Sequence, residues 1–310
     1  MATLRIPDVV PSPAEDCERL KNAFQGLGTD EKAVIRILGR RNAGQRKKIR
    51  ETYHQLYNKS LIDCLISELS GDFRKAVLLW TYDPAERDAR LANEALKSRK
   101  KSIIQLQVIV EIACASSPHH LVAVRQAYCS LFNCSLEEDI ISNVSPPVQK
   151  VLVSLVSSYR YDKELVDYDI ANEEAAILRK PIEAKKLDDD EMIDKCRLPL
   201  CGFDFTARKS FPQEIMACGK GILESVMKVV VWCIDYPEKQ FAEVIKAAIV
   251  GLGTDEDSLT RAIVCRAEID LMNVRAEYFN ANKSSMDNAI IDDTSGDYKD
   301  FLMTLLGANI

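Results

Sequence analysis

Apolar residues recur along this chain at the three- and four-residue intervals of an amphipathic α-helix. Three such stripes follow one another early in the sequence, and each defines one face of a short helix. They are Ile49, Tyr53, Leu56 and Tyr57; Leu61, Leu65 and Leu69; and Phe73, Val77 and Trp80. The alternation typical of a half-buried strand is not convincing anywhere. The pattern therefore predicts an all-α protein built from short helices.

Capping residues mark where several of these helices begin. Ser12-Pro13-Ala14-Glu15 combines an N-cap, a proline at the first helical position and an acid in the capping-box place. Thr29-Asp30-Glu31 offers an N-cap followed by acids in the first turn. Ser70-Gly71-Asp72 does the same for a later helix. Together with the stripes, these signals predict five helices within residues 13–82.

The same pattern returns near the other end of the chain. Residues 24–31 recur as residues 249–256, both ending in Gly-Leu-Gly-Thr-Asp-Glu, and the match continues without a gap for about fifty residues. A second copy lies at one third of that spacing, where Arg50 and Tyr53 correspond to Arg125 and Tyr128. The chain is therefore built from internal repeats.

A third, fainter copy lies between the second and the last. Asp190-Glu191 and Gly221 correspond to parts of the first copy, and Pro199, Gly202 and Pro212 predict shortened helices there. We expect a tail followed by four repeats, with these bounds: 1–12, 13–82, 87–157, 169–238 and 241–310.

Each of the two matching glycine loops is followed by a carboxylate at the same distance. Glu68 comes forty residues after Gly28, and Asp293 comes forty residues after Gly253. This pairing describes a metal site that is assembled from two separated loops. The second copy has Arg99-Lys100-Lys101-Ser102-Ile103 in place of the loop and Asn143 in place of the acid. The third copy is also rewritten, so we expect metal only in the first and last repeats.

Composition narrows the class of protein. The chain has 310 residues, 47% of them apolar and 28% charged, which is ordinary for a soluble globular protein. A formal net charge of −6 argues against nucleic acid as a partner, and against unaided binding to an anionic membrane. The longest apolar runs are too short to span a bilayer, and no secretion signal is evident. We therefore expect a cytoplasmic protein whose ten cysteines are reduced and structural.

The doubled Gly-Leu-Gly-Thr-Asp-Glu with its distant acid, in a four-repeat helical chain, resembles the annexin family over essentially the whole sequence. Leu78-Leu79-Trp80 followed by residues 83–89 and 91–95 resembles the plant branch, as do the short tail and the intact first and fourth repeats. The resemblance implies a curved disc of four repeats with about five helices each, whose convex face carries the glycine loops.

Oxygen ligands explain how such loops would bind Ca²⁺, which takes six to eight oxygens in flexible geometry. Glycines let backbone carbonyls turn toward one point, and a bidentate carboxylate adds two oxygens. One or two positions then remain for water or a lipid phosphate. The first site would use Phe24, Gly26, Gly28 and Glu68, and the second would use Ile249, Gly251, Gly253 and Asp293.

The residues around these ligands extend the prediction. Leu27 and Leu252 lie between the glycines, so we expect them to enter the interfacial layer of a membrane. Glu31 and Glu256 are candidates for secondary calcium sites. We therefore predict calcium-dependent binding to anionic phospholipid, peripheral on membranes when calcium rises. We expect no enzymatic activity, and any oligomer to form only on the membrane.

A plainer interpretation of one Gly-x-Gly-Thr is a helix C-cap glycine followed by a threonine N-cap. Two copies with acids at matched spacing favour calcium. Arg99, Lys100 and Lys101 are candidates for direct contact with lipid phosphates, although a solvated run of charge is the more common explanation.

Other roles proposed for relatives find less support in the residues. A peroxidase would need a histidine where this chain has Arg40, and no phosphate-binding loop of the nucleotide hydrolases is present. Ile35-Arg36-Ile37 matches a short motif proposed for F-actin, but Arg36 repeats as Arg261, which favours a structural salt bridge. Cys114 and Cys233 match positions proposed for redox or channel function, and two core thiols are the simpler explanation.

Overall fold

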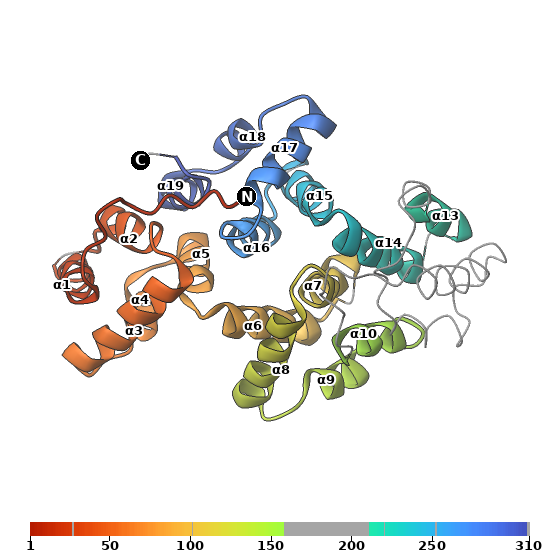
Figure 1. The fold of residues 1–310 in the computed structure, drawn as a ribbon, viewed down its shortest axis with the longest axis horizontal. Helices are drawn as coiled ribbons and strands as arrows, with labels where there is room; N and C mark the ends of the chain where they lie inside the picture. The colour runs from red at the N-terminus through yellow and green to blue at the C-terminus, as the bar shows by residue number, and fades with distance from the viewer. Residues whose placement is uncertain (27, 101, 158–210, 220, 252, 309–310) are drawn as a thin grey trace. The chain divides into compact units, whose positions relative to one another are not determined.

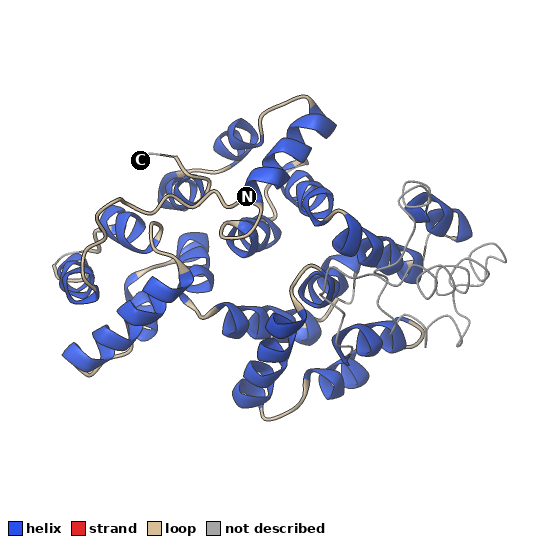
Figure 2. Cartoon of the chain, viewed as in Figure 1, coloured by secondary structure: helices blue, strands red, loops and turns tan. Residues whose placement is uncertain are grey.

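The computed structural model describes residues 1–26, 28–100, 102–157, 211–219, 221–251 and 253–308, and all regular structure in these ranges is helical (Figure 2). The prediction of an all-α protein is therefore confirmed. The chain divides into two compact units, each described separately below: Met1–Arg87 with Glu238–Ile310, and Asp88–Pro237.

The first unit contains two sets of five helices in the same order (Figure 1). The first set is α1 (Pro13–Ala23), α2 (Glu31–Leu38), α3 (Ala43–Tyr57), α4 (Leu61–Glu68) and α5 (Gly71–Thr81). The second set is α15 (Pro237–Ile249), α16 (Glu256–Arg266), α17 (Leu271–Asn282), α18 (Met286–Asp293) and α19 (Gly296–Leu305).

Local sequence accounts for most of the helix starts. The capping box at Ser12 forms as predicted, with the Ser12 side chain and Glu15 exchanging hydrogen bonds. The prediction of Thr29 as the cap of α2 was wrong by one residue. Asp30 caps this helix by accepting a hydrogen bond from the Ala33 amide at 2.9 Å. The Thr29 hydroxyl is instead turned toward a different partner, described below.

The predicted apolar stripes mostly form the core of the first repeat. Ile49, Tyr53, Leu61 and Leu65 are all buried. Leu56 lies on the predicted face of α3 but is 51% exposed. Periodicity identifies one face of a helix, and packing against a neighbour decides whether every turn of that face is covered.

A tryptophan and an arginine stack at the centre of the first repeat. Trp80 is fully buried and donates its indole N–H to the Leu38 carbonyl at 2.8 Å. The Arg46 guanidinium lies 3.6 Å from the centre of the Trp80 ring. Burial lowers the pKa of Arg46 to about 10, and Glu268 of the last repeat partly offsets this effect with a 2.8 Å ion pair. Through the ion pair between Arg46 and Glu268, this stack links the core of the first repeat to the last repeat.

Helices of the first and last repeats pack directly on each other. α5 contacts α16 and α19, and α19 also contacts α2. The rings of Phe73 and Phe301 meet edge to face with centroids 6.0 Å apart. At a more exposed position, Lys75 pairs with Asp257 at 2.6 Å. The two intact repeats therefore share one core.

The N-terminal segment extends this connection along the surface of the last repeat (Figure 1). Thr3 donates its amide to the Ala267 carbonyl at 3.0 Å and its hydroxyl to the Leu305 carbonyl at 2.6 Å. Gly307 has a φ of +88°, and a Cβ there would lie 2.7 Å from the Thr3 carbonyl oxygen. The close approach of the two backbones explains why a glycine is needed.

The second unit holds most of α6 (Pro84–Lys97) together with six further described helices. They are α7 (Ile103–Cys114), α8 (Pro118–Phe132), α9 (Leu136–Asn143), α10 (Val148–Ser157), α13 (Phe211–Cys218) and α14 (Ile222–Asp235). α7 packs on α10 and α14, and α14 also packs on α13. Cys114 and Cys233 are both buried, on α7 and α14. Residues 158–210, with Pro199 and Gly202, lie outside the described residues.

A buried ion pair joins α1 to the segment that follows α2. The Arg41 guanidinium donates two hydrogen bonds to the Asp16 carboxylate, at 2.7 and 2.8 Å, and both residues are buried. In the last repeat Arg266 takes the place of Arg41. It forms an ion pair with Asp270, four residues later in the chain, and its guanidinium lies 4.6 Å from the centre of the Phe241 ring. The arginine is thus repeated while its partner changes.

We expect Asp16→Asn to lower the free energy of unfolding by about 3 kcal/mol, because the substitution leaves the Arg41 charge buried without a counter-charge. Urea denaturation measures this change. Asp8→Asn, at an exposed position, is the matched control and should change stability by less than about 0.5 kcal/mol. Equal stability of the two variants would show that the buried pair contributes little.

Candidate functional site

Each glycine loop is closed at its base by one backbone hydrogen bond. In the first repeat the Asp30 amide donates to the Ala23 carbonyl at 2.9 Å. In the last repeat the Asp255 amide donates to the Ala248 carbonyl at 2.8 Å. The same residue that caps the following helix therefore also closes the loop, and both copies keep this geometry.

The glycines take backbone angles that other residues rarely adopt. Gly26 and Gly28 have φ of +129° and +92°, and Gly251 and Gly253 have φ of +141° and +87°. A Cβ at any of these positions would meet nothing within 4 Å. Backbone conformation rather than crowding therefore requires glycine here. All four glycines are exposed, so the loop backbones are open to solvent.

The Thr29 hydroxyl joins the first loop to the acid predicted from spacing. Its Oγ1 atom lies 3.1 Å from both the backbone carbonyl oxygen and Oε2 of Glu68, the last residue of α4. The hydroxyl donates to these oxygens, and the half-buried carboxylate keeps lone pairs for another partner. The two separated parts of the predicted site are therefore in direct contact.

The last repeat reproduces this contact. Thr254 Oγ1 lies 3.0 Å from the backbone carbonyl oxygen of Asp293 and 2.6 Å from its Oδ2. Asp293 is the last residue of α18, as Glu68 is of α4. The shorter aspartate side chain is reached by a shorter hydrogen bond. Both acids are thus held beside their glycine loops.

The remaining predicted residues fall around these contacts. Phe24 is the C-cap of α1, whereas Ile249 is the last residue of α15. Glu31 and Glu256 are the first residues of α2 and α16 and are half-buried. Leu27 and Leu252 lie outside the described residues. The structure therefore places the glycines and acids together, while the role of each residue stays a prediction.

The second repeat has lost this arrangement. Its helix α7 begins at Ile103, although the repeat spacing would place the counterpart of Glu31 at position 106. The helix therefore includes the last part of the segment that forms the loop elsewhere, and Ser102 caps it with Gln105. Asn143 donates its side-chain amide to the Asp139 carbonyl at 2.8 Å within its own helix.

Side-chain chemistry alone would not reveal the two loops. Among the described residues, no group of three or more histidine, cysteine, aspartate or glutamate side chains could hold a metal ion. Each candidate site has one carboxylate and otherwise backbone carbonyls, which are the hard oxygen donors that Ca²⁺ accepts. Within the same described ranges, no helix has the length and apolar character required to cross a bilayer.

Known proteins share both the sequence and the fold. The annexin family model matches residues 15–80, 87–155 and 240–305. The chain belongs to the annexin family. Annexin D3 of Arabidopsis thaliana is 56% identical over the full length of both chains, and this similarity places the chain in the plant branch. The solved structure of annexin III matches with a TM-score of 0.89, at 31% identity, covering 100% of this chain and 98% of that one.

A calcium-bound relative also has this fold. The structure of calcium-bound annexin (Sm)1 matches with a TM-score of 0.84, at 26% identity, over 99% of this chain and 93% of that one. Membership of the annexin family supports a calcium-dependent phospholipid-binding protein that associates peripherally with membranes. The resemblance inferred from the glycine loops is therefore confirmed at the level of the family.

The two threonines are the site residues that sequence reasoning missed. Thr29 was interpreted as a helix cap, because threonine before an acidic first turn is a common cap, and no role was predicted for Thr254. The signal that could have identified them is their recurrence with the distant acid: the second repeat, which lacks the acid, has Ile104 in the same place. In that repeat Ile104 lies inside α7, which Ser102 caps, so the hydroxyl and the acid are absent together.

We expect Gly28→Ala to lower the free energy of unfolding by about 1–2 kcal/mol, because alanine must adopt a φ near +92° or displace the loop. Thermal or urea unfolding measures this effect. Gly44→Ala in α3 is the control: its φ is ordinary, and the same change should raise stability by about 0.4–1 kcal/mol. A stabilised Gly28→Ala variant would contradict the backbone argument.

Proposed function

We propose that this annexin binds anionic phospholipid through two calcium ions, one at the glycine loop of the first repeat and one at that of the last. The observation that carries the proposal is the duplicated contact between a loop threonine and a distant acid, at 3.1 Å for Glu68 and 2.6 Å for Asp293. A helix cap would not require the threonine to reach another helix, whereas a two-part calcium site does.

The donor set fits Ca²⁺ in kind and in number. In the first repeat the carbonyls of Phe24, Gly26 and Gly28 supply three oxygens and Glu68 supplies up to two. Ile249, Gly251, Gly253 and Asp293 have the same roles in the last repeat. The ion prefers six to eight oxygens, so at least one position remains for a lipid phosphate oxygen. When bound, calcium supplies positive charge between protein and membrane.

Charge supports strict dependence on the ion. The chain carries a formal net charge of −6, which opposes approach to an anionic surface. A site with one carboxylate and neutral carbonyls is weak without a lipid, because the protein provides few charged ligands. We infer that calcium and lipid complete each other's binding. Leu27 and Leu252, which lie between the glycines in the sequence, would add apolar contact with the interface, as predicted from the sequence.

We propose binding, rather than catalysis, as the role of the chain, with cytoplasmic localisation between calcium signals. The second and third repeats would serve as structural repeats, and the earlier start of α7, at Ile103, supports this division for the second repeat. Membrane attachment would then rest on the two repeats that share one core in the first unit. Glu31 and Glu256 remain candidates for secondary calcium sites.

Pelleting with phosphatidylserine vesicles tests the proposal directly. Wild-type protein should sediment with the vesicles in calcium and return to the supernatant when chelator is added. Glu68→Gln combined with Asp293→Asn should raise the calcium concentration for half-maximal pelleting about tenfold or more, because each site loses its charged ligand. Single variants would rank the two sites.

The matched control removes two exposed acids elsewhere in the first repeat and tail, Glu51→Gln with Asp8→Asn. It should leave the calcium requirement within about twofold of wild type, because general surface charge acts weakly at physiological salt. Pelleting that persists in chelator would contradict the calcium bridge, and a double site variant that behaves like the control would exclude these ligands.

The threonine contacts generate a separate expectation. Thr29→Val with Thr254→Val should raise the calcium requirement about threefold to tenfold, because each acid loses one positioning hydrogen bond. Thr29→Ser with Thr254→Ser keeps both hydroxyls and should behave like wild type. Calcium titration of vesicle pelleting measures both. If the valine and serine variants titrate alike, the hydroxyls do not position the acids for calcium.

A further inference from the structure

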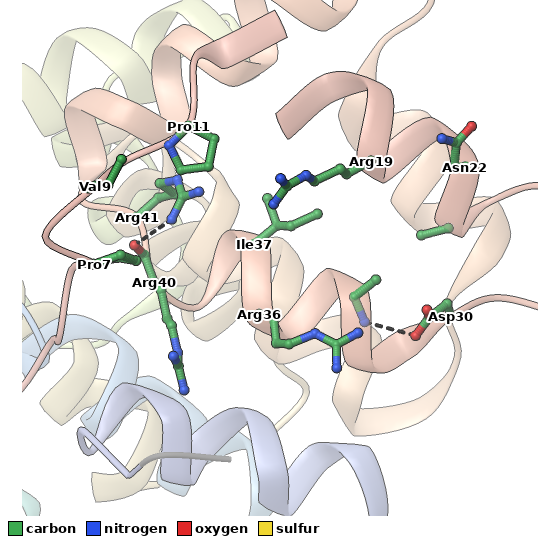
Figure 3. Close-up of a pocket in the computed structure, with 12 residues that line it drawn as sticks. Pro7, Val9, Pro11, Arg19, Asn22, Asp30, Arg36, Ile37, Arg40 and Arg41 are labelled. Carbon is green, nitrogen blue, oxygen red and sulfur yellow. Dashed lines mark hydrogen bonds between the residues drawn. The ribbon is translucent and has the colours of Figure 1, made fainter. Parts of the chain in front are cut away.

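A groove of about 610 Å³ lies in the first repeat, and its lining includes Ala23 and Asp30, whose backbone hydrogen bond closes the base of the glycine loop. Its walls are α1, α2 and the extended segment that precedes α1 (Figure 3). A volume in this range is typical of pockets that hold small organic molecules. The N-terminal segment forms one wall, so the groove combines this segment with the two helices.

Four arginines line the groove, and two of them are already engaged. Arg41 forms the buried ion pair with Asp16 and donates to the Arg40 carbonyl at 3.1 Å. Arg40 has an interaction of its own as well. Arg40 and Arg41 are therefore already engaged within the protein, which leaves the other two arginines of the groove as candidates for binding a ligand.

Arg19 on α1 and Arg36 on α2 are both exposed, and neither forms a hydrogen bond or ion pair within the described part of the chain. Figure 3 shows the Arg19 guanidinium reaching over Ile37, with Arg36 on the neighbouring helix. The one acid in the lining is Asp30, whose carboxylate accepts the capping hydrogen bond from Ala33. Outside the lining, Glu15 on α1 interacts electrostatically with Arg19, while its carboxylate accepts hydrogen bonds from Ser12. Arg19 and Arg36 therefore border one groove whose lining holds a single carboxylate.

Comparison of the repeats shows that this arrangement belongs to the first repeat. Arg261, the counterpart of Arg36, is only 4% exposed, and Val244 occupies the place of Arg19. The sequence-based expectation that Arg36 forms a structural salt bridge is therefore not met, because this side chain faces solvent. The pair of exposed arginines is therefore not a feature that the first and last repeats share.

The remaining lining is apolar. Pro7, Val9, Pro11 and Ile37 contribute side chains to the same groove. The Val9 side chain is 85% exposed although it borders the groove, so its apolar surface is left uncovered. An occupant with an anionic end and an apolar body would satisfy both the arginines and this strip.

We propose that the groove binds a small organic phosphate ester. Arg19 and Arg36 hold the phosphate, since guanidinium groups match phosphate oxygens in charge and in paired hydrogen-bond geometry. The body of the ester lies against Pro7, Val9 and Pro11. This binding requires no calcium and goes beyond the membrane function proposed above.

Calorimetric titration with phenyl phosphate, in chelator, tests the site without engaging the calcium loops. Arg19→Gln with Arg36→Gln should weaken binding about tenfold or more, because two charge-assisted contacts are lost. Lys47→Gln with Lys48→Gln removes the same charge from exposed positions on α3 and should bind within about twofold of wild type. All substitutions are at exposed sites, so unchanged thermal unfolding confirms that the fold is intact.

Binding of inorganic phosphate tests the arginines separately from the apolar part of the groove. Wild-type protein should bind phenyl phosphate more tightly than inorganic phosphate, and Val9→Ser should reduce this preference without changing the binding of inorganic phosphate. No binding of phenyl phosphate by wild-type protein, or equal binding by the arginine variant and the lysine control, would overturn the proposal.

The phosphate could belong to a free metabolite or to a lipid headgroup, and vesicles distinguish the two sources. Vesicles of phosphatidic acid in chelator should fail to bind if the ligand is a free ester. Binding that is lost with Arg19→Gln and Arg36→Gln would identify a lipid phosphate in the same groove. Calcium-dependent pelleting of this arginine variant should be normal, so failure here leaves the calcium proposal separately testable.

Discussion

The hydrogen bond between a loop threonine and a distant acid is the contact on which the candidate site depends. A glycine loop can turn its carbonyls outward, but it has no charge of its own. The carboxylate comes from the end of a different helix, forty residues away in sequence. Thr29 and Thr254 join the two parts at 3.1 and 2.6 Å. The five-helix repeat supports this contact, because its packing brings the ends of α1 and α4, and of α15 and α18, to one place.

The repeats have diverged through small changes with large consequences. In the second repeat the helix α7 starts at Ile103, three residues before position 106, which corresponds to the start of α2, so the last part of the loop segment is helical instead. In the first repeat the N-terminal segment adds a wall that the last repeat does not have, and a groove results. Equivalent arginines illustrate the same divergence: Arg36 is exposed and Arg261 is buried. The same order of helices thus carries different surfaces in the two repeats.

Much of the fold could be predicted because its signals are local. The capping box at Ser12, the stripe through Leu61 and Leu65 and the proline at the start of α1 all formed as expected. The glycines and acids of the site were found by counting, since duplication made their spacing visible. Leu56 and Thr29 were interpreted wrongly, because exposure and the choice of hydrogen-bond partner depend on neighbours from other helices.

The sequence by itself determined the helices, their repetition, the family and which repeats keep both a glycine loop and an acid. These features are encoded by periodicity, capping and spacing, which act within one segment of chain. Tertiary structure alone decided that the threonine hydroxyls reach the acids, that Arg19 and Arg36 line a common groove, and that Arg261 does not. The physical reason is that these outcomes depend on the relative placement of packed helices, and no local pattern specifies which side chains that packing brings together.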